Sequence, residues 1–308
     1  MATEPLLTEG PDKAPTKPFD GFVARPGGKV TDRPHLINAW SLAHASMLAY
    51  RDEATVKRTC GEWGFKFVRT LGYEGRLGFD TECYVAANEE IVVVAFRGTE
   101  PTSWRDWVSD LNALKTRSGP FNSYVHQGFL NGLLKRVDGT SIRDEVVKEV
   151  SELIGDRAVY ITGHSLGAAL ATLCTAFLLD TGKIKVEGLY TYGSPRVGTH
   201  RFANVVMKKS GGKVYRFVNK EDLVARVPKV LYHHVGNWWY MSGKNQTLTK
   251  NPGFCQLLKD RICIDFDYFP DSIADHSIKH GYVVGLWKNI ASRYDVPDST
   301  PGGTAWES

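Results

Sequence analysis

Apolar positions divide the chain into short strand-like runs and longer helix-like runs that alternate along its length. The most compact strand-like run is Ile91 to Phe96, where six apolar residues follow one another and leave no polar face. Such a run is typical of a strand in the middle of a mostly parallel sheet. Further strands are predicted in the ranges 65–69, 81–88, 158–162, 186–193 and 213–218, with a strand or hairpin arm in 230–241.

Apolar residues at helical spacing predict an amphipathic helix over His35 to Tyr50 that covers the sheet. Other predicted helices lie at 141–154, 166–179 and 199–209, with one beginning at 124 and a last one opening at 275. Because strand and helix alternate several times, the sequence predicts an α/β fold. Its central sheet is expected to be mostly parallel, with helices on both faces.

One junction in this pattern carries chemistry. Between the predicted strand 158–162 and the predicted helix 166–179 lies Gly163-His164-Ser165-Leu166-Gly167, a G-x-S-x-G sequence. A strand that passes directly into a helix must turn sharply at Ser165, and the two glycines leave room for the turn. The turn points the Ser165 hydroxyl outward, close to the free N–H groups at the helix N-terminus. Ser165 is therefore the candidate nucleophile.

Composition narrows the class of protein. The chain has 308 residues, 42% of them hydrophobic, and a net charge of +4 without a basic run, so nucleic acid is not the expected partner. Five cysteines are too few for a disulfide scaffold. Cys255 and Cys263 are spaced to close a small loop, or they are two free thiols. Neither a metal nor another cofactor is expected.

A serine hydroxyl needs a base to take its proton and a carboxylate to hold that base. Loops at the C-terminal ends of later strands are the place to look for both. Glu221 and Asp222 follow the strand 213–218, and Asp222 is preferred because apolar Leu-Val after it would bury its loop. The base is expected to be His276, which opens a helix after a loop, with His280 one turn later as its main competitor. His233 and His234 also follow Asp222 in sequence.

Two segments near residue 100 allow two interpretations each. Thr99 follows the strand 91–96 and suits either an oxyanion donor or a simple turn. The segment 101–111 predicts a short helix with an apolar face made by Trp104, Trp107, Val108 and Leu111. It is either a lid over an apolar cleft or an ordinary packed surface helix, and the two tryptophans favour the lid.

Seven spaced motifs over roughly residues 84–290 make the chain resemble the class 3 lipases, the filamentous-fungal triacylglycerol lipase type. They are VVVAFRGT ending at Thr99, WVSD ending at Asp110, HQGF from His126, GHSLG around Ser165, YGSPRVG from Tyr192, FVNKED ending at Asp222, and DHS around His276. The resemblance implies an α/β-hydrolase fold with a short helical lid formed by 101–111. It implies Ser165, His276 and Asp222 as the catalytic triad, and Thr99 with the Leu166 backbone N–H as the oxyanion hole.

The function implied is hydrolysis of fatty-acyl esters, most of all acylglycerols, at a lipid–water interface. Alternatives within enzymes are a phospholipase A1 or galactolipase and a feruloyl-type esterase. A non-catalytic lipase-like scaffold is the alternative outside enzymes, and the complete triad argues against it. The sequence does not indicate an oligomeric state.

The two ends differ from the middle of the chain. Residues 1–31 are rich in proline and are expected to form a flexible lead-in, 32–294 a single hydrolase domain, and 295–308 a loose tail. The first 31 residues show no apolar signal-peptide region. The longest apolar run, 168–179, is shorter than the roughly 20 residues of a membrane span. These features predict a cytoplasmic protein, or a secreted one if a leader has been removed.

Overall fold

The structure is a computed structural model. It describes residues 11–26, 34–72, 82–98, 116–137, 139–220, 222, 224–228, 232–243, 245–253 and 276–299. Several predicted features lie outside these residues, among them Thr99, the segment 101–111, and Cys255 and Cys263.

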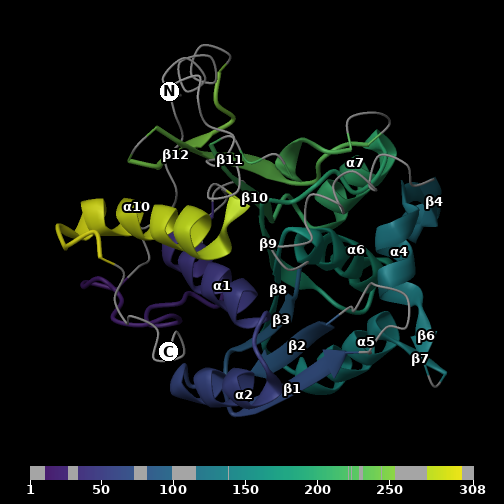
Figure 1. The fold of residues 1–308 in the computed structure, drawn as a ribbon. Coiled ribbons are helices and arrows are strands. Elements are labelled where there is room, and N and C mark those ends of the chain that lie inside the picture. The colour runs from purple at the N-terminus through teal and green to yellow at the C-terminus, as the bar shows by residue number, and fades with distance from the viewer. Residues whose placement is uncertain are drawn as a thin grey trace.

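An eight-stranded sheet in the order β1-β2-β3-β8-β9-β10-β11-β12 forms the centre of the molecule (Figure 1). From β3 to β11 neighbouring strands run parallel, whereas β1, β2 and β12 run antiparallel to the neighbours nearer the middle. The mostly parallel sheet predicted from the alternation of elements is confirmed. The strands are β1 (Phe67–Gly72), β2 (Glu82–Ala87), β3 (Ile91–Phe96), β8 (Ala158–His164), β9 (Val186–Tyr192), β10 (Val214–Asn219), β11 (Asn237–Ser242) and β12 (Thr247–Lys250).

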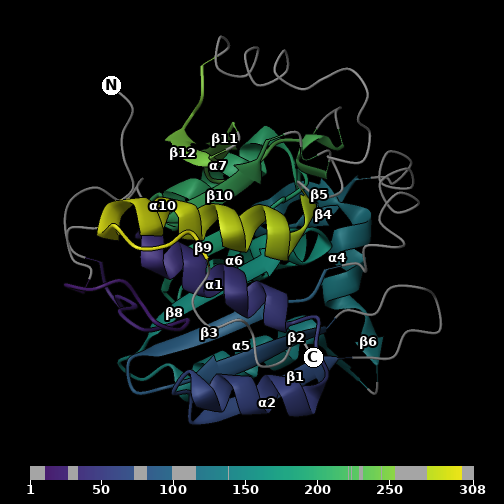
Figure 2. The ribbon, with the colours of Figure 1, turned by 60° about the vertical axis from the view of Figure 1, so that its left-hand side comes forward.

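Helices cover both faces of the sheet (Figures 1 and 2). Strand β3 shows why: Val92, Val94 and Phe96 belong to one core, and the intervening residues 91, 93 and 95 belong to the other. The first core includes residues of α4 (Gln127–Leu134), α5 (Ile142–Leu153), α6 (Leu166–Asp180) and α7 (His200–Lys209). The second includes residues of α1 (Leu36–Leu48), α2 (Glu53–Glu62) and α10 (Val284–Tyr294).

Short elements join these layers. Strands β4 (Thr116–Gly119) and β5 (Ser123–His126) form one two-stranded sheet, and β6 (Arg136–Val137) and β7 (Thr140–Ser141) form another. Single helical turns lie at Pro120–Asn122 and Val224–Arg226. The prediction of a helix beginning at Tyr124 is wrong for its first residues, because residues 124–126 pair with β4 and the helix begins at Gln127.

Helix α1 differs from its prediction in one respect. The sequence predicts an amphipathic helix, yet every residue from Leu36 to Leu48 is buried, polar ones included. The helix lies between the sheet and α10, and residues 11–26 contact it as well (Figure 2). A helix covered on all sides needs partners for its polar side chains, and Asn38 finds them in the backbone N–H and C=O of Val23.

Residues 11–26, within the segment expected to be a flexible lead-in, lie against this second core. Phe19 packs between the rings of Trp63 and Phe65, and Phe22 packs edge-on against Tyr160. The Tyr160 hydroxyl also donates to the backbone carbonyl of Ala24 at 3.0 Å. These contacts fix this part of the N-terminal segment on the molecule.

The last helical stretch begins with a π-helix at Ile278–Val283 and continues into α10. At its end, the Trp287 indole donates to the Pro297 carbonyl at 3.1 Å, within the expected loose tail. Among the described residues, no helix is both long enough and apolar enough to cross a membrane.

Candidate active site

Ser165 stands between β8 and α6 in a strained backbone conformation, with φ 57° and ψ −127°. The two flanking glycines explain how the turn fits. A Cβ on Gly163 would lie 2.4 Å from the Gly167 carbonyl oxygen, and a Cβ on Gly167 would lie 2.4 Å from the Phe96 carbonyl oxygen. Only glycine allows this approach of strand, turn and helix. The sharp strand-to-helix turn predicted from G-x-S-x-G is confirmed.

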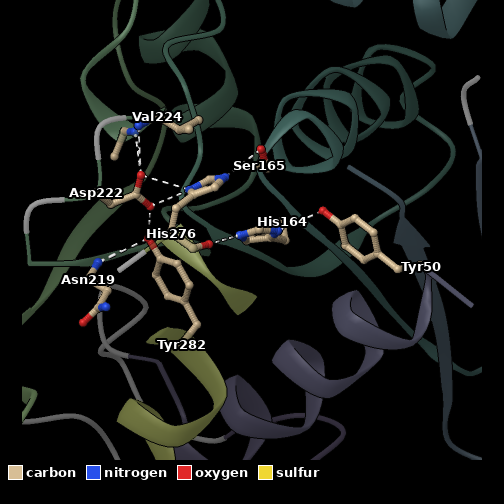
Figure 3. A network of polar contacts seen from close by, with 9 residues as sticks. Tyr50, His164, Ser165, Asn219, Asp222, Val224, His276 and Tyr282 are labelled. Carbon is tan, nitrogen blue, oxygen red and sulfur yellow. Dashed lines mark hydrogen bonds and ion pairs between the residues drawn. The ribbon is translucent and has the colours of Figure 1, made fainter. Parts of the chain in front are cut away.

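The turn brings Ser165 together with the two residues expected to act with it (Figure 3). His276 Nε2 lies 2.9 Å from Ser165 Oγ, and His276 Nδ1 lies 3.0 Å from each carboxylate oxygen of Asp222. All three side chains are buried, with exposed fractions of 1% for Ser165, 0% for Asp222 and 7% for His276. Residues more than 50 positions apart in sequence thus form one hydrogen-bonded line.

The protons in this line follow from its partners. A carboxylate only accepts hydrogen bonds, so Nδ1 of His276 carries the proton that faces Asp222. In the neutral imidazole Nε2 is then an acceptor, and the Ser165 hydroxyl donates to it. This is the arrangement that lets a histidine take a proton from serine.

Asp222 is held in its charged form although it is fully buried. Its Oδ1 accepts from the backbone N–H of Val224 at 2.9 Å, and the Tyr282 hydroxyl donates to its Oδ2. Burial acts to raise the pKa of Asp222, but the charge and hydrogen bonds of His276 and the hydrogen bond of Tyr282 outweigh it, and the pKa is lowered. The carboxylate therefore stays available to balance a charge on the imidazole.

The C-terminal edge of the sheet supplies the platform for the acid and the base. Gly193 follows β9 with φ +59°, and a Cβ there would lie 2.6 Å from Asp222 Oδ2 and 3.0 Å from His276 Nδ1. The absence of a side chain at this position lets the acid–base pair lie against the end of the strand.

Two further residues extend this network beyond His276, and sequence reasoning missed both roles. His164 Nε2 lies 2.6 Å from the backbone carbonyl oxygen of His276, and the Tyr50 hydroxyl lies 2.9 Å from His164 Nδ1 (Figure 3). The adjacency of His164 to Ser165 was the only local signal. Tyr50 and Tyr282 offered none, because their contacts depend on folding over more than 50 residues.

The competing candidates lie away from Ser165. His280 is exposed, and its backbone N–H is bonded to the Ser277 hydroxyl. His233 is also exposed and joins Gly198 through its backbone. Glu221, the alternative carboxylate, lies outside the described residues.

The predicted oxyanion-hole and lid residues are described only in part. Leu166 is the first residue of α6, directly after Ser165. Thr99, Trp104, Trp107, Val108 and Leu111 lie outside the described residues. The residue before Thr99 is close to the nucleophile, since a Cβ on Gly98 would lie 3.2 Å from Ser165 Cβ.

Within the part of the chain that the structure describes, no three His, Cys, Asp or Glu side chains gather to hold a metal ion. The site places a buried hydroxyl beside a base and its carboxylate, which suits attack on an acyl carbon.

Comparison with known proteins gives this geometry a context. Residues 93–232 match the family model described as lipase (class 3). The chain is 34% identical over 178 residues to secreted mono- and diacylglycerol lipase A of Penicillium cyclopium, covering 55% of each chain. It is 36% identical over 157 residues to the chloroplastic phospholipase A(1) DAD1 of Arabidopsis thaliana, covering 46% of this chain and 34% of that one. The matches therefore span about half, or less, of the length of these curated relatives.

Solved structures agree on the fold. The triacylglyceride lipase of Rhizomucor miehei superposes with a TM-score of 0.60 at 24% identity, covering 81% of this chain and 96% of that chain. Together with the mostly parallel sheet and its two helical layers, this likeness makes the fold that of an α/β-hydrolase.

Proposed function

We propose that the chain is a member of the class 3 lipase family and a serine hydrolase that cleaves fatty-acyl esters, chiefly acylglycerols. One observation carries this proposal: His276 Nε2 lies 2.9 Å from Ser165 Oγ while its Nδ1 contacts Asp222. A relative that is 34% identical over 178 residues is named a mono- and diacylglycerol lipase, which supports this substrate class.

In the proposed reaction, Ser165 Oγ attacks the ester carbonyl carbon as its proton passes to His276 Nε2. Asp222 stabilises the resulting imidazolium through Nδ1–H. The imidazolium then returns the proton to the departing alcohol oxygen, leaving an acyl group on Ser165. Water repeats the sequence with the same base, which releases the fatty acid and restores the serine.

The oxyanion of each tetrahedral intermediate needs hydrogen-bond donors. We assign this role to the Leu166 backbone N–H and to Thr99. Leu166 begins the helix that follows the nucleophile, where backbone N–H groups lack helical partners. Thr99 follows Gly98, which lies against Ser165. The apolar residues Trp104, Trp107, Val108 and Leu111 are proposed to form the lid and to contact lipid substrate.

The direct test replaces the nucleophile. Ser165→Ala should lower kcat/KM for p-nitrophenyl butyrate by at least ~10³-fold, because the remaining groups cannot form an acyl-enzyme. Ser151→Ala, which removes an exposed hydroxyl from α5, is the matched control and should keep the wild-type rate. Labelling by a fluorophosphonate probe should be lost in the first variant and kept in the second. Unchanged hydrolysis by Ser165→Ala would overturn the proposal.

A second candidate is phospholipase A1 activity, favoured by the 36% identity to the relative named phospholipase A(1). A panel of trioctanoin, monoolein and phosphatidylcholine separates the two. Release of fatty acid mainly from the glycerides supports the lipase, and release from the sn-1 position of phosphatidylcholine supports the alternative.

An activity increase when the substrate forms droplets would support the lid, whereas equal rates on monomers and emulsions would contradict it.

A further inference from the structure

His164 ties the nucleophile's strand to the backbone of the base. It is the last residue of β8, adjacent to Ser165, and its Nε2 lies 2.6 Å from the carbonyl oxygen of His276. A carbonyl only accepts, so Nε2–H is the donor. The two imidazole rings also lie together, with centroids 4.6 Å apart. One residue of the rigid sheet thus contacts both the main chain and the ring of His276.

Tyr50 contacts the other nitrogen of the His164 ring and stabilises the tautomer that donates to His276. Its hydroxyl lies 2.9 Å from His164 Nδ1. Since a neutral imidazole has one N–H and Nε2 uses it toward His276, Nδ1 must accept from Tyr50. Burial, together with the nearby His276, lowers the pKa of His164 to about 3, so the ring stays neutral near pH 7. The other tautomer would direct a lone pair at the carbonyl oxygen of His276, and the hydrogen bond from Tyr50 to Nδ1 stabilises the ring against it.

The position of this contact makes it relevant to proton transfer. His276 stands outside the sheet, just before the π-helix Ile278–Val283, whereas Ser165 is fixed at the end of β8. The distance between base and nucleophile therefore depends on what holds the main chain at His276. Displacements of about 1 Å at such a site cost on the order of 10²-fold in rate.

We propose that His164 and Tyr50 are positioning residues of the reaction: Tyr50 fixes the tautomer of His164, and His164 holds the main chain of His276 at the distance from Ser165 that proton transfer requires. This inference rests on the proposed function of the triad and adds two residues that act through His276 without touching substrate.

The test compares three variants by kcat and KM for p-nitrophenyl butyrate and by the rate constant of fluorophosphonate labelling. His164→Phe keeps the ring but removes both hydrogen bonds, and should lower kcat and labelling by about 10- to 100-fold with KM little changed. His164→Gln keeps an N–H donor at a similar reach and should recover most of that loss. Tyr50→Phe should lower kcat about 3- to 10-fold, as expected for one lost hydrogen bond.

A double-mutant cycle shows whether Tyr50 acts through His164. In the His164→Phe background, Tyr50→Phe should have no further effect on kcat, because the group it orients is gone. Tyr84→Phe is the matched control: it removes a buried hydroxyl that donates to the Ala45 carbonyl of helix α1, and it should keep the wild-type kcat. Circular dichroism confirms that each variant is folded.

The outcomes separate this inference from the proposed function. If the wild type neither hydrolyses esters nor reacts with the probe, the proposed function fails. If the wild type is active and His164→Phe retains its kcat, the positioning role is wrong, and additive effects in the cycle exclude a path through His164. Should His164→Phe fail to fold, His164→Gln and Tyr50→Phe still decide. A loss in Tyr50→Phe beside near-wild-type activity in His164→Gln supports the inference, and wild-type kcat in Tyr50→Phe overturns it.

Discussion

Residues at the site are constrained as much by missing side chains as by those present. Gly193 has φ +59°, where an alanine is strained, and its missing Cβ leaves the space that Asp222 and His276 occupy. A side chain at this position would strain the backbone and also collide with Asp222 and His276. At some other positive-φ glycines, such as Gly211, an added Cβ would strain the backbone but meet no neighbour.

We therefore expect Gly193→Ala to inactivate the enzyme while leaving most of its stability. The new methyl group would displace Asp222 or His276, so kcat/KM should fall by at least about 100-fold. Gly211→Ala is the control: it has a similar φ of +63° but nothing within 4 Å of an added Cβ. It should lower the free energy of unfolding by about 1 kcal/mol without changing kcat/KM. Ester hydrolysis and urea unfolding of both variants check this, and equal activity of the two would contradict it.

At the scale of single residues, the sequence predicts those functional residues whose role depends on a local motif. Ser165 sits in a turn that needs two glycines, and Asp222 and His276 occupy loops expected at the C-terminal edge of the sheet. The structure brings these three together. Tyr50 and His164 escaped prediction because a hydrogen bond between residues 114 positions apart leaves no local trace.

Among the elements, the π-helix after His276 has the clearest consequence for the site. It lies between His276 and α10 and places Tyr282, whose hydroxyl donates to Asp222 and accepts from the Asn219 backbone N–H at 3.2 Å. π-Helical turns are rare in proteins and often occur at functional sites. Here the widened turn places one phenol where it joins the acid to the end of strand β10.

Removing that hydroxyl should weaken the charged form of Asp222. Tyr282→Phe is expected to lower kcat/KM about 10-fold and the free energy of unfolding at pH 7 by about 1–3 kcal/mol, because a buried charged acceptor and an N–H lose their partner. The hydroxyl helps lower the pKa of Asp222. A carboxyl group whose pKa is lowered by folding contributes this stability fully above its unfolded pKa of 3.8 and loses it as the pH falls through its lower folded pKa. The cost of Tyr282→Phe should therefore shrink as the pH falls below 3.8.

Urea unfolding at pH 7 and pH 3 measures this difference. Tyr84→Phe again serves as the control, since its hydroxyl contacts a backbone carbonyl and no carboxylate. Its cost should not depend on pH in this way. An equal loss for Tyr282→Phe at both pH values would show that the phenol does not support the charge.

Elements were predictable where burial on both faces or a cap left a clear pattern, as for β3, which spans the expected Ile91–Phe96. The amphipathicity expected of α1 was wrong because α10 and residues 11–26 cover its outer side. The helix predicted from Tyr124 begins three residues later because residues 124–126 pair with the neighbouring strand β4 in a hairpin, and α4 starts directly after them. For α1, distant segments decided the outcome.

In the whole molecule, the site lies at the C-terminal edge of the sheet, and buried ionisable groups link its stability to pH. His164 is fully covered, with Tyr50, His276 and Tyr282 around its ring and Asp222 near enough to act on it. Burial lowers its pKa from 6.5 to about 3 despite the nearby carboxylate. His234 is likewise shifted well below its usual pKa by burial and by Arg216 and Arg196. The folded state therefore resists protonation that the unfolded chain accepts.

The sign of the pH effect follows from that difference. Above pH 6.5 an ordinary imidazole is neutral in both states, so stability does not depend on His164 there. As the pH falls below 6.5 the unfolded chain binds a proton that the folded one does not, and stability decreases until about pH 3. From pH 6.5 to pH 5 this one residue should remove about 2 kcal/mol from the free energy of unfolding.

Urea unfolding between pH 7 and pH 5 should show a shallower decrease for His164→Gln than for the wild type. His280→Gln, which replaces an exposed histidine, should keep the wild-type slope. Parallel pH curves for wild type and His164→Gln would show that His164 is not held neutral in the folded protein. The tautomer that contacts Tyr50 and His276 requires a neutral ring.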